Sequence, residues 1–359
     1  MEYVGILVNQ KLHRGIGKGR FGHEQLPFYE EAGTQYRLTP CYFRLQDILP
    51  GGTMVRAFVK NGLGYAQKVL PMPRVIHNRA IYRKPSAHAK INALIGRGTM
   101  IFNACNRYGK LDIYNALMEN VALRPHLPCT VEANPQSLKV MMEQYPSLMI
   151  KPNSGSIGRG IMKLERKQDA WFLTYPSLKK RNCLRTIVFT DHLPLLLRQR
   201  MRKRRYIVQQ MLPLATWDGR PFDFRVSVQK NETGAWQVTG MVGKVAAKGK
   251  YVTNVAQGGQ VLDQELLLSG LPVPAAQVKQ QIAEFALKAA EQLSLKFPHL
   301  ADLGLDIGIT EFGFPVFIES NGRDQRYSFA KGGMTQEWKA CYRNPVGYAR
   351  HLLEHPEHY

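Results

Sequence analysis

A carboxylate and an amide close an apolar run in the stretch VFIESNGRD, residues Val316 to Asp324. Glu319 and Asn321 are two positions apart, so on a strand both side chains point to the same face. An earlier strand, LGLDIGI, is joined to this one by the turn TEFG, and the pairing brings Asp306 beside them. Two carboxylates and an amide oxygen make an oxygen-only site suited to Mg²⁺ that carries phosphates. A plain turn over the triplet SNG is the alternative.

A glycine-rich segment, IKPNSGSIGRGI, surrounds Lys151. Glycines let backbone N–H groups close around phosphate oxygens, and a lysine at the end of the preceding strand adds a positive charge. The segment is not a Walker A loop, because no GK[ST] follows and a strand, GIMKLER, comes next. An ordinary hairpin turn is the alternative. With the carboxylates in the same chain, the sequence favours phosphate and metal binding.

The strand DFRVSV places Asp223 and Arg225 on one face. An ion pair at a sheet surface is the commonest meaning of such a pair. If the strand lines the same cleft, Arg225 could hold a transferring phosphoryl or acylphosphate group.

The elements that must position these residues form an α/β (α+β) body. A first α/β unit covers residues 1–105, with a strand at Tyr3–Val8 and a basic glycine-rich loop, HRGIGKGRFG. Helices GKLDIYNALMEN, with Leu111, Tyr114 and 117–118 on one face, and PQSLKVMMEQY then precede the strands LMIKPN and RYIVQQML. Hairpins follow from residue 221, and a long helix with an apolar stripe, Val278, Ile282, Phe285 and Ala289, leads to the closing hairpin and a terminal helix GYARHLLEH.

Composition limits the class of protein. The chain has 359 residues, 44% of them hydrophobic, so it can hold two or three packed units. No run approaches the length of a membrane span, and no secretory signal is evident. Five scattered cysteines without a CxxC pair suit reduced thiols in the cytoplasm and argue against a structural zinc site.

The charge is strongly basic, with 49 Lys and Arg against 27 Asp and Glu. Such a balance attracts polyanions. Ten basic residues fall between Lys179 and Arg205, but few aromatic residues interrupt them, so the run favours a solvated face over a nucleic-acid groove. None of the ten histidines is paired at metal-ligand spacing.

Taken in chain order, the motifs resemble the ATP-grasp superfamily, and more closely the YheC/YheD family of endospore coat-associated ATP-grasp proteins. The resemblance rests on VIHNR, FNACNRYGKLDIYNAL, PHLPCT, MIKPNSGSIGRGI, YIVQQML, DFRVSVQKN, KYVTNVAQGG and LGLDIGI…GFPVFIESN, and it covers nearly the whole chain. It implies an ATP-grasp fold that holds the nucleotide between two lobes. The expected units are an N-terminal pre-ATP-grasp domain at 1–105, a small lobe at 106–212 and a large lobe at 213–359.

The resemblance also implies site residues. ATP is expected to contact phosphate-binding lysines, a flexible loop over the triphosphate and a hinge strand that reads the adenine edge: Lys110, Lys151, Ser154, Gly155, Ser156, Gly158, Gly160, Gln209, Gln210, Met211 and Leu212. Magnesium, as a pair of ions bridged by Glu319, is expected on Asp306, Glu319 and Asn321. The catalytic group comprises Arg225, Lys244 and Asn254, with Gly258 and Gly259 in the same loop as Asn254. Related glutamate-ligase-type members tend to carry Arg at the position of Lys244.

The implied reaction is ATP- and Mg²⁺-dependent ligation of a carboxylate to an amine or similar nucleophile through an acylphosphate. The carboxylate and the nucleophile are unknown, and the basic charge would favour an acidic peptide or polymer. An ATP-grasp kinase and a non-catalytic nucleotide-binding protein of the spore coat are the alternatives. A cytoplasmic protein associated with the spore coat is expected, with no membrane and no nucleic-acid partner. After Asn321 the segment GRDQRYSF differs from the loop common in ligases, which leaves the substrate open.

Overall fold

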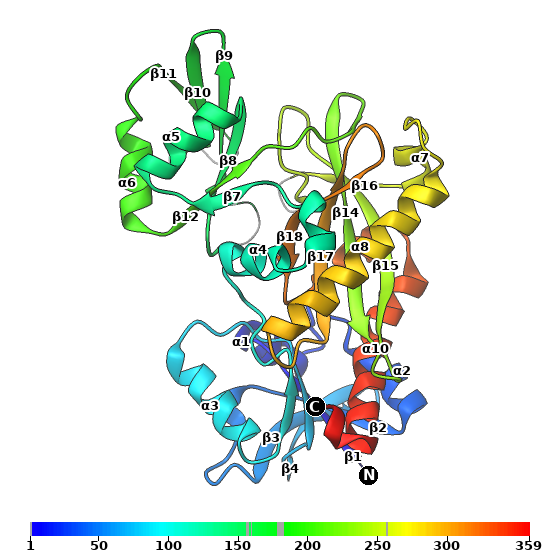
Figure 1. Cartoon of the computed structure of the whole chain (residues 1–359). Helices are drawn as coiled ribbons and strands as arrows, with labels where there is room; N and C mark the ends of the chain where they lie inside the picture. The colour runs from blue at the N-terminus through cyan, green and yellow to red at the C-terminus, as the bar shows by residue number, and fades with distance from the viewer. Residues whose placement is uncertain (1, 156–157, 159, 178–182, 256–257) are drawn as a thin grey trace.

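A computed structural model describes residues 2–155, 158, 160–177, 183–255 and 258–359. Its strands form three six-stranded sheets that follow one another along the chain. In Figure 1 the first sheet lies at the bottom, the second at the upper left and the third at the centre and right. The domain boundaries at residues 105 and 212 remain a prediction.

The first sheet has the strand order β4-β3-β2-β1-β5-β6. Strand β1 pairs in parallel with β2 and β5, and β5 pairs in parallel with β6. Helices form the crossovers from β1 to β2 and from β5 to β6. Its elements are β1 (Glu2–Leu7), α1 (Gln10–Ile16), α2 (Leu26–Tyr36), β2 (Leu38–Phe43), η1 (Leu45–Asp47), β3 (Met54–Asn61), β4 (Gly64–Pro71), β5 (Val75–Asn78), α3 (Pro85–Ile95) and β6 (Met100–Phe102).

The predicted basic loop HRGIGKGRFG is wrong in its first part, where the chain forms helix α1. This helix includes Gly15. A Cβ on Gly15 would collide with the carbonyl oxygen of Arg20, so the glycine allows the chain to turn back directly after the helix.

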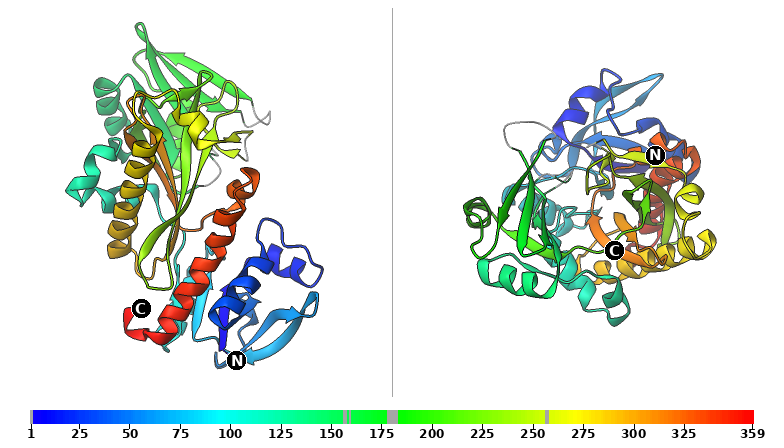
Figure 2. Two further views of the ribbon diagram at one scale, coloured as in Figure 1. Left: turned by 90° about the vertical axis from the view of Figure 1, so that its right-hand side faces the viewer. Right: turned by 90° about the horizontal axis from the view of Figure 1, so that it is seen from above.

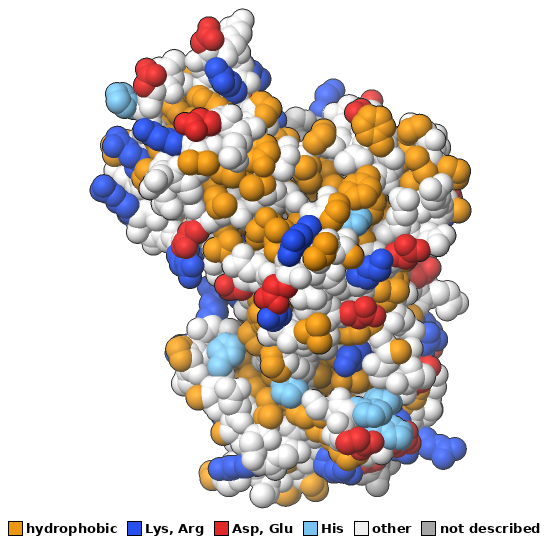
Figure 3. Space-filling view, viewed as in Figure 1, with side chains coloured by type: hydrophobic (Ala, Val, Ile, Leu, Met, Phe, Trp, Pro, Cys, Tyr) orange, Lys and Arg blue, Asp and Glu red, His pale blue; other side chains and the backbone are white. Residues whose placement is uncertain are grey.

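The second sheet is antiparallel, in the order β11-β10-β9-β8-β12-β7. Helices α5 and α6 lie beside this sheet (Figure 1). The elements of this part are α4 (Lys110–Met118), η2 (Val121–His126), β7 (Thr130–Glu132), α5 (Pro135–Gln144), β8 (Ser147–Pro152), β9 (Met162–Lys167), β10 (Ala170–Pro176), β11 (Leu184–Phe189), α6 (Leu195–Lys203) and β12 (Tyr206–Gln210). Figure 3 shows Lys and Arg side chains along the outer edge of this lobe, where α6 lies.

Helix α4 buries a face that overlaps the predicted one at Leu117 alone. Ile113, Ala116 and Leu117 are buried in it, whereas Leu111 and Tyr114 are only partly covered. The three buried residues belong to the same hydrophobic cluster as helix α8 of the third sheet, so α4 packs on the third sheet's core rather than on the second's.

The third sheet has the order β16-β15-β14-β17-β18, and β13 pairs with β14. On α8 the predicted stripe Val278, Ile282, Phe285 and Ala289 is confirmed, since all four are buried. The elements are β13 (Thr216–Trp217), β14 (Arg220–Lys230), β15 (Trp236–Val245), β16 (Gln260–Leu262), α7 (Gln264–Leu268), α8 (Ala275–Lys296), β17 (Asp302–Ile309), β18 (Pro315–Asn321), α9 (Tyr327–Lys331), α10 (Thr335–Glu354) and η4 (Pro356–His358).

The terminal helix joins the first and third sheets. Helix α10 is longer than the predicted segment GYARHLLEH and continues through Pro345. Figure 2 shows it between the N-terminal sheet and the third sheet. Its residues Tyr342 and Val346 share one hydrophobic cluster with Tyr42 of the first sheet and Val242 of the third. These two sheets therefore share a core.

A buried ionic network reinforces this junction. One oxygen of Asp302, on β17, lies 2.7 Å from Arg326 Nη2, 3.3 Å from Arg79 Nη1 and 3.2 Å from His77 Nε2. Asp302 is fully buried, and the surrounding guanidinium groups hold the pKa of its carboxyl far below the ordinary range although burial alone would raise it. A buried charge is tolerated only when it is paired in this way.

The motif FNACN also serves this junction. Asn103 has φ 51°, a left-handed conformation that asparagine tolerates better than most residues. Its Nδ2 donates to the carbonyl oxygens of Asp302 (2.6 Å) and Gly322 (2.8 Å), and its Oδ1 accepts from the N–H of Ala301 (2.9 Å) and of Asp302 (3.0 Å). One side chain thus fixes the start of β17 against the first sheet.

Across the described ranges, no helix combines the length and the apolar character needed to cross a membrane.

Candidate functional site

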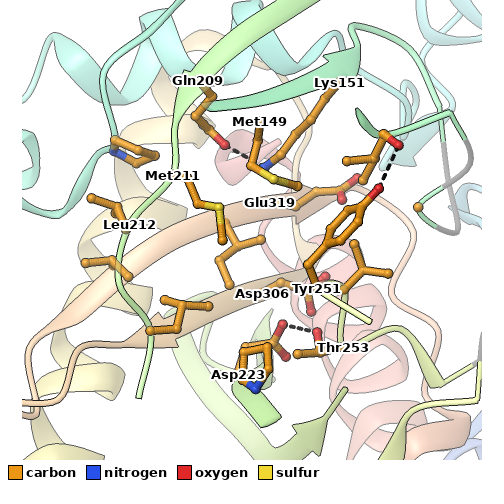
Figure 4. Close-up of a pocket in the computed structure, with 18 of the residues that line it drawn as sticks. Met149, Lys151, Gln209, Met211, Leu212, Asp223, Tyr251, Thr253, Asp306 and Glu319 are labelled. Atoms are coloured by element: carbon orange, nitrogen blue, oxygen red, sulfur yellow. Dashed lines mark hydrogen bonds between the residues drawn. The ribbon is translucent and has the colours of Figure 1, made fainter. Parts of the chain in front are cut away.

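A cavity of about 410 Å³ lies between the second and third sheets. Figure 4 shows Lys151 and Gln209 entering it from the second sheet and Asp223, Asp306 and Glu319 from the third. The cavity has an apolar side, with Met149, Ile161, Met211, Leu212 and Phe317, and a charged side. Small-ligand sites commonly combine apolar walls with a few polar groups that fix orientation.

Asp306 is the centre of the charged side. The guanidinium of Arg225, on β14, grips its carboxylate with two bonds, Nε to Oδ1 at 2.9 Å and Nη2 to Oδ2 at 3.0 Å. Lys244 Nζ, on β15, lies 2.6 Å from Oδ1 of the same carboxylate. Burial raises the pKa of this carboxyl, but Arg225 and Lys244 outweigh burial and lower it to about 2. Asp306 is therefore ionised at neutral pH.

Glu319 lies directly across the hairpin from Asp306, as predicted. The pairing skips one residue here: Asp306 faces Glu319, while Ile307 faces Phe317. Because of this bulge Phe317 lies opposite Ile307 and belongs to the hydrophobic core that borders the cavity, while Glu319 lies opposite Asp306. Lys110 Nζ, from α4, lies 2.6 Å from Glu319 Oε1.

Asn321 is the third predicted metal ligand. It is paired with Gly304 in the same hairpin and lines an adjoining cavity of about 280 Å³ rather than the main one. Glu319 lines both cavities. The three predicted oxygen donors thus follow one edge of the site, with Glu319 in the middle.

This donor set fits Mg²⁺ in its chemistry. The ligands are oxygens only, Asp306 is ionised, and the cations around the two carboxylates show that the edge attracts positive charge. In the described part of the chain, no group of three or more His, Cys, Asp or Glu side chains could hold a metal by itself. A magnesium ion at this edge would therefore need further oxygen ligands, which phosphate groups supply.

Lys151 lies at the end of β8, buried at the back of the cavity. Its Nζ donates to Gln209 Oε1 at 2.5 Å, and Gln209 Nε2 donates to Thr130 Oγ1 at 2.8 Å. Burial lowers the pKa of this ammonium to about 8, and the charge of Lys110 adds to the effect. The sheet thus presents a lysine held by a neutral amide, which an anion could recruit.

The predicted hinge strand also lines the cavity. Gln209, Gln210, Met211 and Leu212 all contribute to its wall. The backbone N–H of Met211 donates to the carbonyl oxygen of Ser147 at 3.0 Å, so this N–H is already used within the protein. Gln210 is tied to Cys129 through its backbone N–H (2.8 Å) and its side-chain oxygen (3.3 Å).

The glycine-rich loop is divided between the two cavities. Gly158 lines the main cavity and Gly155 the adjoining one. Ser154 is exposed, and its carbonyl accepts a bond from Arg204 Nη2 at 2.7 Å. Gly160 has φ 80°, which favours glycine. Ser156 lies outside the described residues.

The predicted catalytic residues are Arg225 on β14, Lys244 on β15 and Asn254 in the loop after β15. Arg225, Lys244 and Asp306 are in contact as described, and Asn254 lines the main cavity. Of the two alternatives for Asp223 and Arg225, the ion pair between them is not formed: Asp223 Oδ1 lies 2.9 Å from Lys244 Nζ, and Arg225 is paired with Asp306. Thr253 donates to Asp223, which anchors the loop that carries Asn254.

One acid beside the site was not predicted from the sequence. Asp324, fully buried, accepts from Arg225 Nη1 at 3.1 Å and from the hydroxyl of Ser227. Burial raises the pKa of its carboxyl. Arg225 is thus held between two acids, one from β17 and one from the loop after β18. Ser227 lies two positions after Arg225 on β14, so the sequence places both side chains on one face of that strand.

Comparisons with known proteins agree with this architecture. A model of the YheC/D-like ATP-grasp family matches residues 98–352. The endospore coat-associated protein YheD of Bacillus subtilis (strain 168) is 25% identical over 301 residues, and the match covers 81% of this chain but only 65% of YheD.

Two solved structures show the same fold at low identity. The VanG D-Ala:D-Ser ligase from Enterococcus faecalis aligns with a TM-score of 0.56 and 10% identity, over 97% of this chain and 99% of that chain. The ATP-grasp ligase PsnB, complexed with minimal precursor, Mg and ADP, aligns with a TM-score of 0.52 and 13% identity, over 97% of each chain. The three sheets therefore form an ATP-grasp fold, and the chain belongs to the YheC/D-like ATP-grasp family.

Proposed function

We propose that this protein is an ATP- and Mg²⁺-dependent ligase that joins a carboxylate to an amine or similar nucleophile through an acylphosphate. One observation carries the proposal: a single cavity combines an apolar wall beside the hinge residues 209–212 with Lys151, Lys244, Asp306 and Glu319. Its apolar wall suits a nucleotide base, and its charged wall suits phosphates and their metal. Membership of an ATP-grasp family and the ligase neighbours support it.

The roles follow from chemistry and position. Asp306, Glu319 and Asn321 would hold Mg²⁺ as two ions. Magnesium would neutralise charge on the phosphate oxygens. Lys110 and Lys151 would exchange Glu319 and Gln209 for phosphate oxygens, and the segment 154–160 would cover the triphosphate.

The chemistry is phosphoryl transfer followed by acyl transfer. A substrate carboxylate oxygen attacks the γ-phosphorus, the bond from that phosphorus to the β,γ-bridging oxygen breaks, and ADP leaves. The nucleophile then attacks the acyl carbon, loses its proton, and expels phosphate. Arg225 and Lys244 would stabilise the negative charge that develops on the transferred group. Lys244 lines the cavity, and Arg225 is fixed on Asp306, which also lines it.

Melting temperature with and without Mg·ATP tests the nucleotide site. A ligand at 100 times its Kd should add about 2.7 kcal/mol to the stability of the folded protein. We expect a magnesium-dependent rise in the wild type and a smaller or absent rise in Lys151→Ala and Glu319→Ala. No rise at millimolar Mg·ATP would remove the basis of the proposal.

A screen of acceptors by ADP release then tests the reaction. Mass spectrometry of the product separates the ligase from a kinase, because amide formation removes water from the combined substrates and a kinase adds a phosphate. ADP release that persists in Glu319→Ala with a true substrate would contradict the metal assignment. The coat association of YheD supports a place at the spore coat.

A further inference from the structure

A second cavity, of about 280 Å³, adjoins the proposed nucleotide site. The two share a wall made by Lys151, Gln209 and residues 317–319. The second cavity opens between the first sheet's segment at 81–83, the connection at 106–110 and the loop at 320–325 after β18. A group bound there would reach the shared wall, where the proposed phosphoryl transfer takes place.

The lining of this cavity is strongly basic. Among its described lining residues one is acidic, Glu319, and five are cationic: Arg83, Arg107, Lys110, Lys151 and Arg323. Lys110 is neutralised by Glu319 at 2.6 Å, and Lys151 is bonded to Gln209. Three guanidinium groups therefore remain to set the charge of the cavity.

These guanidinium groups are poorly neutralised by the protein. Within the described residues neither Arg83 nor Arg107 has a carboxylate within 4.0 Å, and Arg323 has only Glu24, at 3.7 Å. Burial lowers the pKa of Arg107, and the charges of Arg83 and Arg204 lower it further. Like charges are thus held together without an anion that would stabilise them.

The remaining walls make the cavity a small, defined space. Ile81, Tyr108 and Ile113 line it beside the charged groups. Its volume is near the lower end of small-ligand pockets, about 300 Å³, so it fits one small acid or one acidic side chain rather than a folded surface. Planar guanidinium groups bind carboxylates through paired hydrogen bonds, which favours carboxylates as the occupants.

We propose that this second cavity binds the acceptor of the reaction, and that the acceptor is a small carboxylic acid with at least one further carboxylate. The reacting carboxylate lies at the shared wall beside Lys151 and Glu319. The further carboxylates are bound by Arg83, Arg107 and Arg323, which are specificity-determining residues for the proposed ligase. The role of this cavity as the acceptor site rests on the proposed function, but the binding of an anion in it does not depend on ATP.

Calorimetric titration without nucleotide tests the site directly. The probes are propane-1,2,3-tricarboxylate, the monocarboxylate butyrate and inorganic phosphate, at constant ionic strength. We expect the tricarboxylate to bind at least about tenfold more tightly than butyrate, since each charged hydrogen-bonded contact is worth about that factor. Arg83→Gln and Arg107→Gln should each weaken the tricarboxylate by about tenfold for the same reason.

Arg56→Gln is the matched control, because Arg56 is exposed on β3 of the same sheet and outside the cavity. It should bind the tricarboxylate like the wild type. The melting-temperature rise with Mg·ATP should survive in Arg83→Gln and Arg107→Gln, which separates loss of the acceptor site from loss of the nucleotide site.

Equal binding of tricarboxylate and butyrate, or unchanged binding in both arginine variants, would overturn the proposal. Phosphate that binds more tightly than the tricarboxylate, with the same dependence on Arg83 and Arg107, would assign the cavity to a phosphorylated ligand and overturn it as well. A wild type that fails to respond to Mg·ATP but passes these titrations would reject the ligase and retain the polycarboxylate site.

Discussion

Arg225 grips Asp306 with two hydrogen bonds, and Asp306 is also the first of the proposed magnesium ligands. The same guanidinium bonds Asp324, so it is fixed by two acids from different elements. The carboxylate of Asp306 thus has two roles: it pairs with Arg225, and it is proposed to bind the metal. Its substitution should affect both the fold and the site, and the two effects can be measured separately.

We expect Asp306→Asn to destabilise the protein without any ligand. The substitution leaves the buried Lys244 and the largely covered Arg225 next to each other with one acid fewer, and breaking a buried pair typically costs about 3–5 kcal/mol. Urea unfolding measures this loss. Asp218→Asn is the control, because Asp218 is 77% exposed and should change stability by less than about 0.5 kcal/mol. Equal unfolding midpoints for the two variants would contradict the central role of Asp306.

Proton uptake should accompany nucleotide binding near pH 8. The pKa of Lys151 is about 8 in the free protein, and an adjacent anionic phosphate would raise it. At that pH about half of the lysine is neutral, so binding should take up about half a proton, and affinity should fall as the pH rises further. Calorimetry of Mg·ATP binding in two buffers of different ionisation enthalpy measures the uptake.

Lys151→Arg provides the comparison for this measurement, because arginine stays charged and has no proton to take up. The proton uptake should disappear in that variant. If the wild type and Lys151→Arg take up the same amount, another group is the source.

His77 should make the stability depend on pH between about 4 and 6.5. Burial lowers its pKa to about 4, although Asp302 raises it in part. The unfolded chain, with an ordinary histidine pKa of about 6.5, binds more protons in this window, so stability is full above it and falls as the pH drops through it. The loss between pH 8 and pH 4.5 should be about 2–3 kcal/mol.

Chemical denaturation of wild type and His77→Gln at both pH values checks this contribution. The variant should lose less stability than the wild type over the same interval, whatever its stability at pH 8. Parallel losses in the two proteins would show that other groups carry the pH dependence.

Gly304→Ala should destabilise the protein and weaken the proposed nucleotide site. A Cβ at Gly304 would collide with the carboxylate of Asp324 and lie 2.9 Å from Arg225 Nη1. Overpacking of this kind typically costs about 1–3 kcal/mol, and it would displace Arg225 from Asp306. The measurements are the unfolding midpoint and the Mg·ATP-induced rise in melting temperature.

Gly64→Ala is the control for this prediction, since a Cβ there meets open space at the turn between β3 and β4. A Gly304→Ala protein as stable and as responsive to Mg·ATP as Gly64→Ala would show that the packing beneath Arg225 does not matter.

The sequence predicted the closing hairpin well because its signals are local. Strands β17 and β18 are separated by one short turn, so their pairing and the approach of Asp306 to the end of β18 could be predicted. The bulge that sets Asp306 opposite Glu319, where plain counting gives Ile318, could not be predicted in this way. The partner of Arg225 could not be found in this way. Asp306 lies 81 residues further along the chain, and the local signal favoured Asp223 instead. Pairing between distant strands depends on the tertiary fold.

Other elements were missed for different reasons. Helix α6 buries only Leu197 and carries basic residues elsewhere, so it lacks the apolar stripe by which a helix is recognised. Helix α10 contains Pro345, which suggests a break although the helix continues. The hairpin of β3 and β4 was also missed, although the turn residues NGLG between the two strands are typical of a hairpin.

The attachment of the second sheet has a consequence for how the chain could be divided or exchanged. The chain enters this sheet at Cys129 and leaves it at Gln210, and these two residues are bonded to each other. A segment whose ends touch can be removed or replaced without separating the parts that it leaves behind. Residues 129–210 are thus suited to exchange as one unit in chimeric proteins. The first and third sheets, which share a core through α10, would have to be exchanged together.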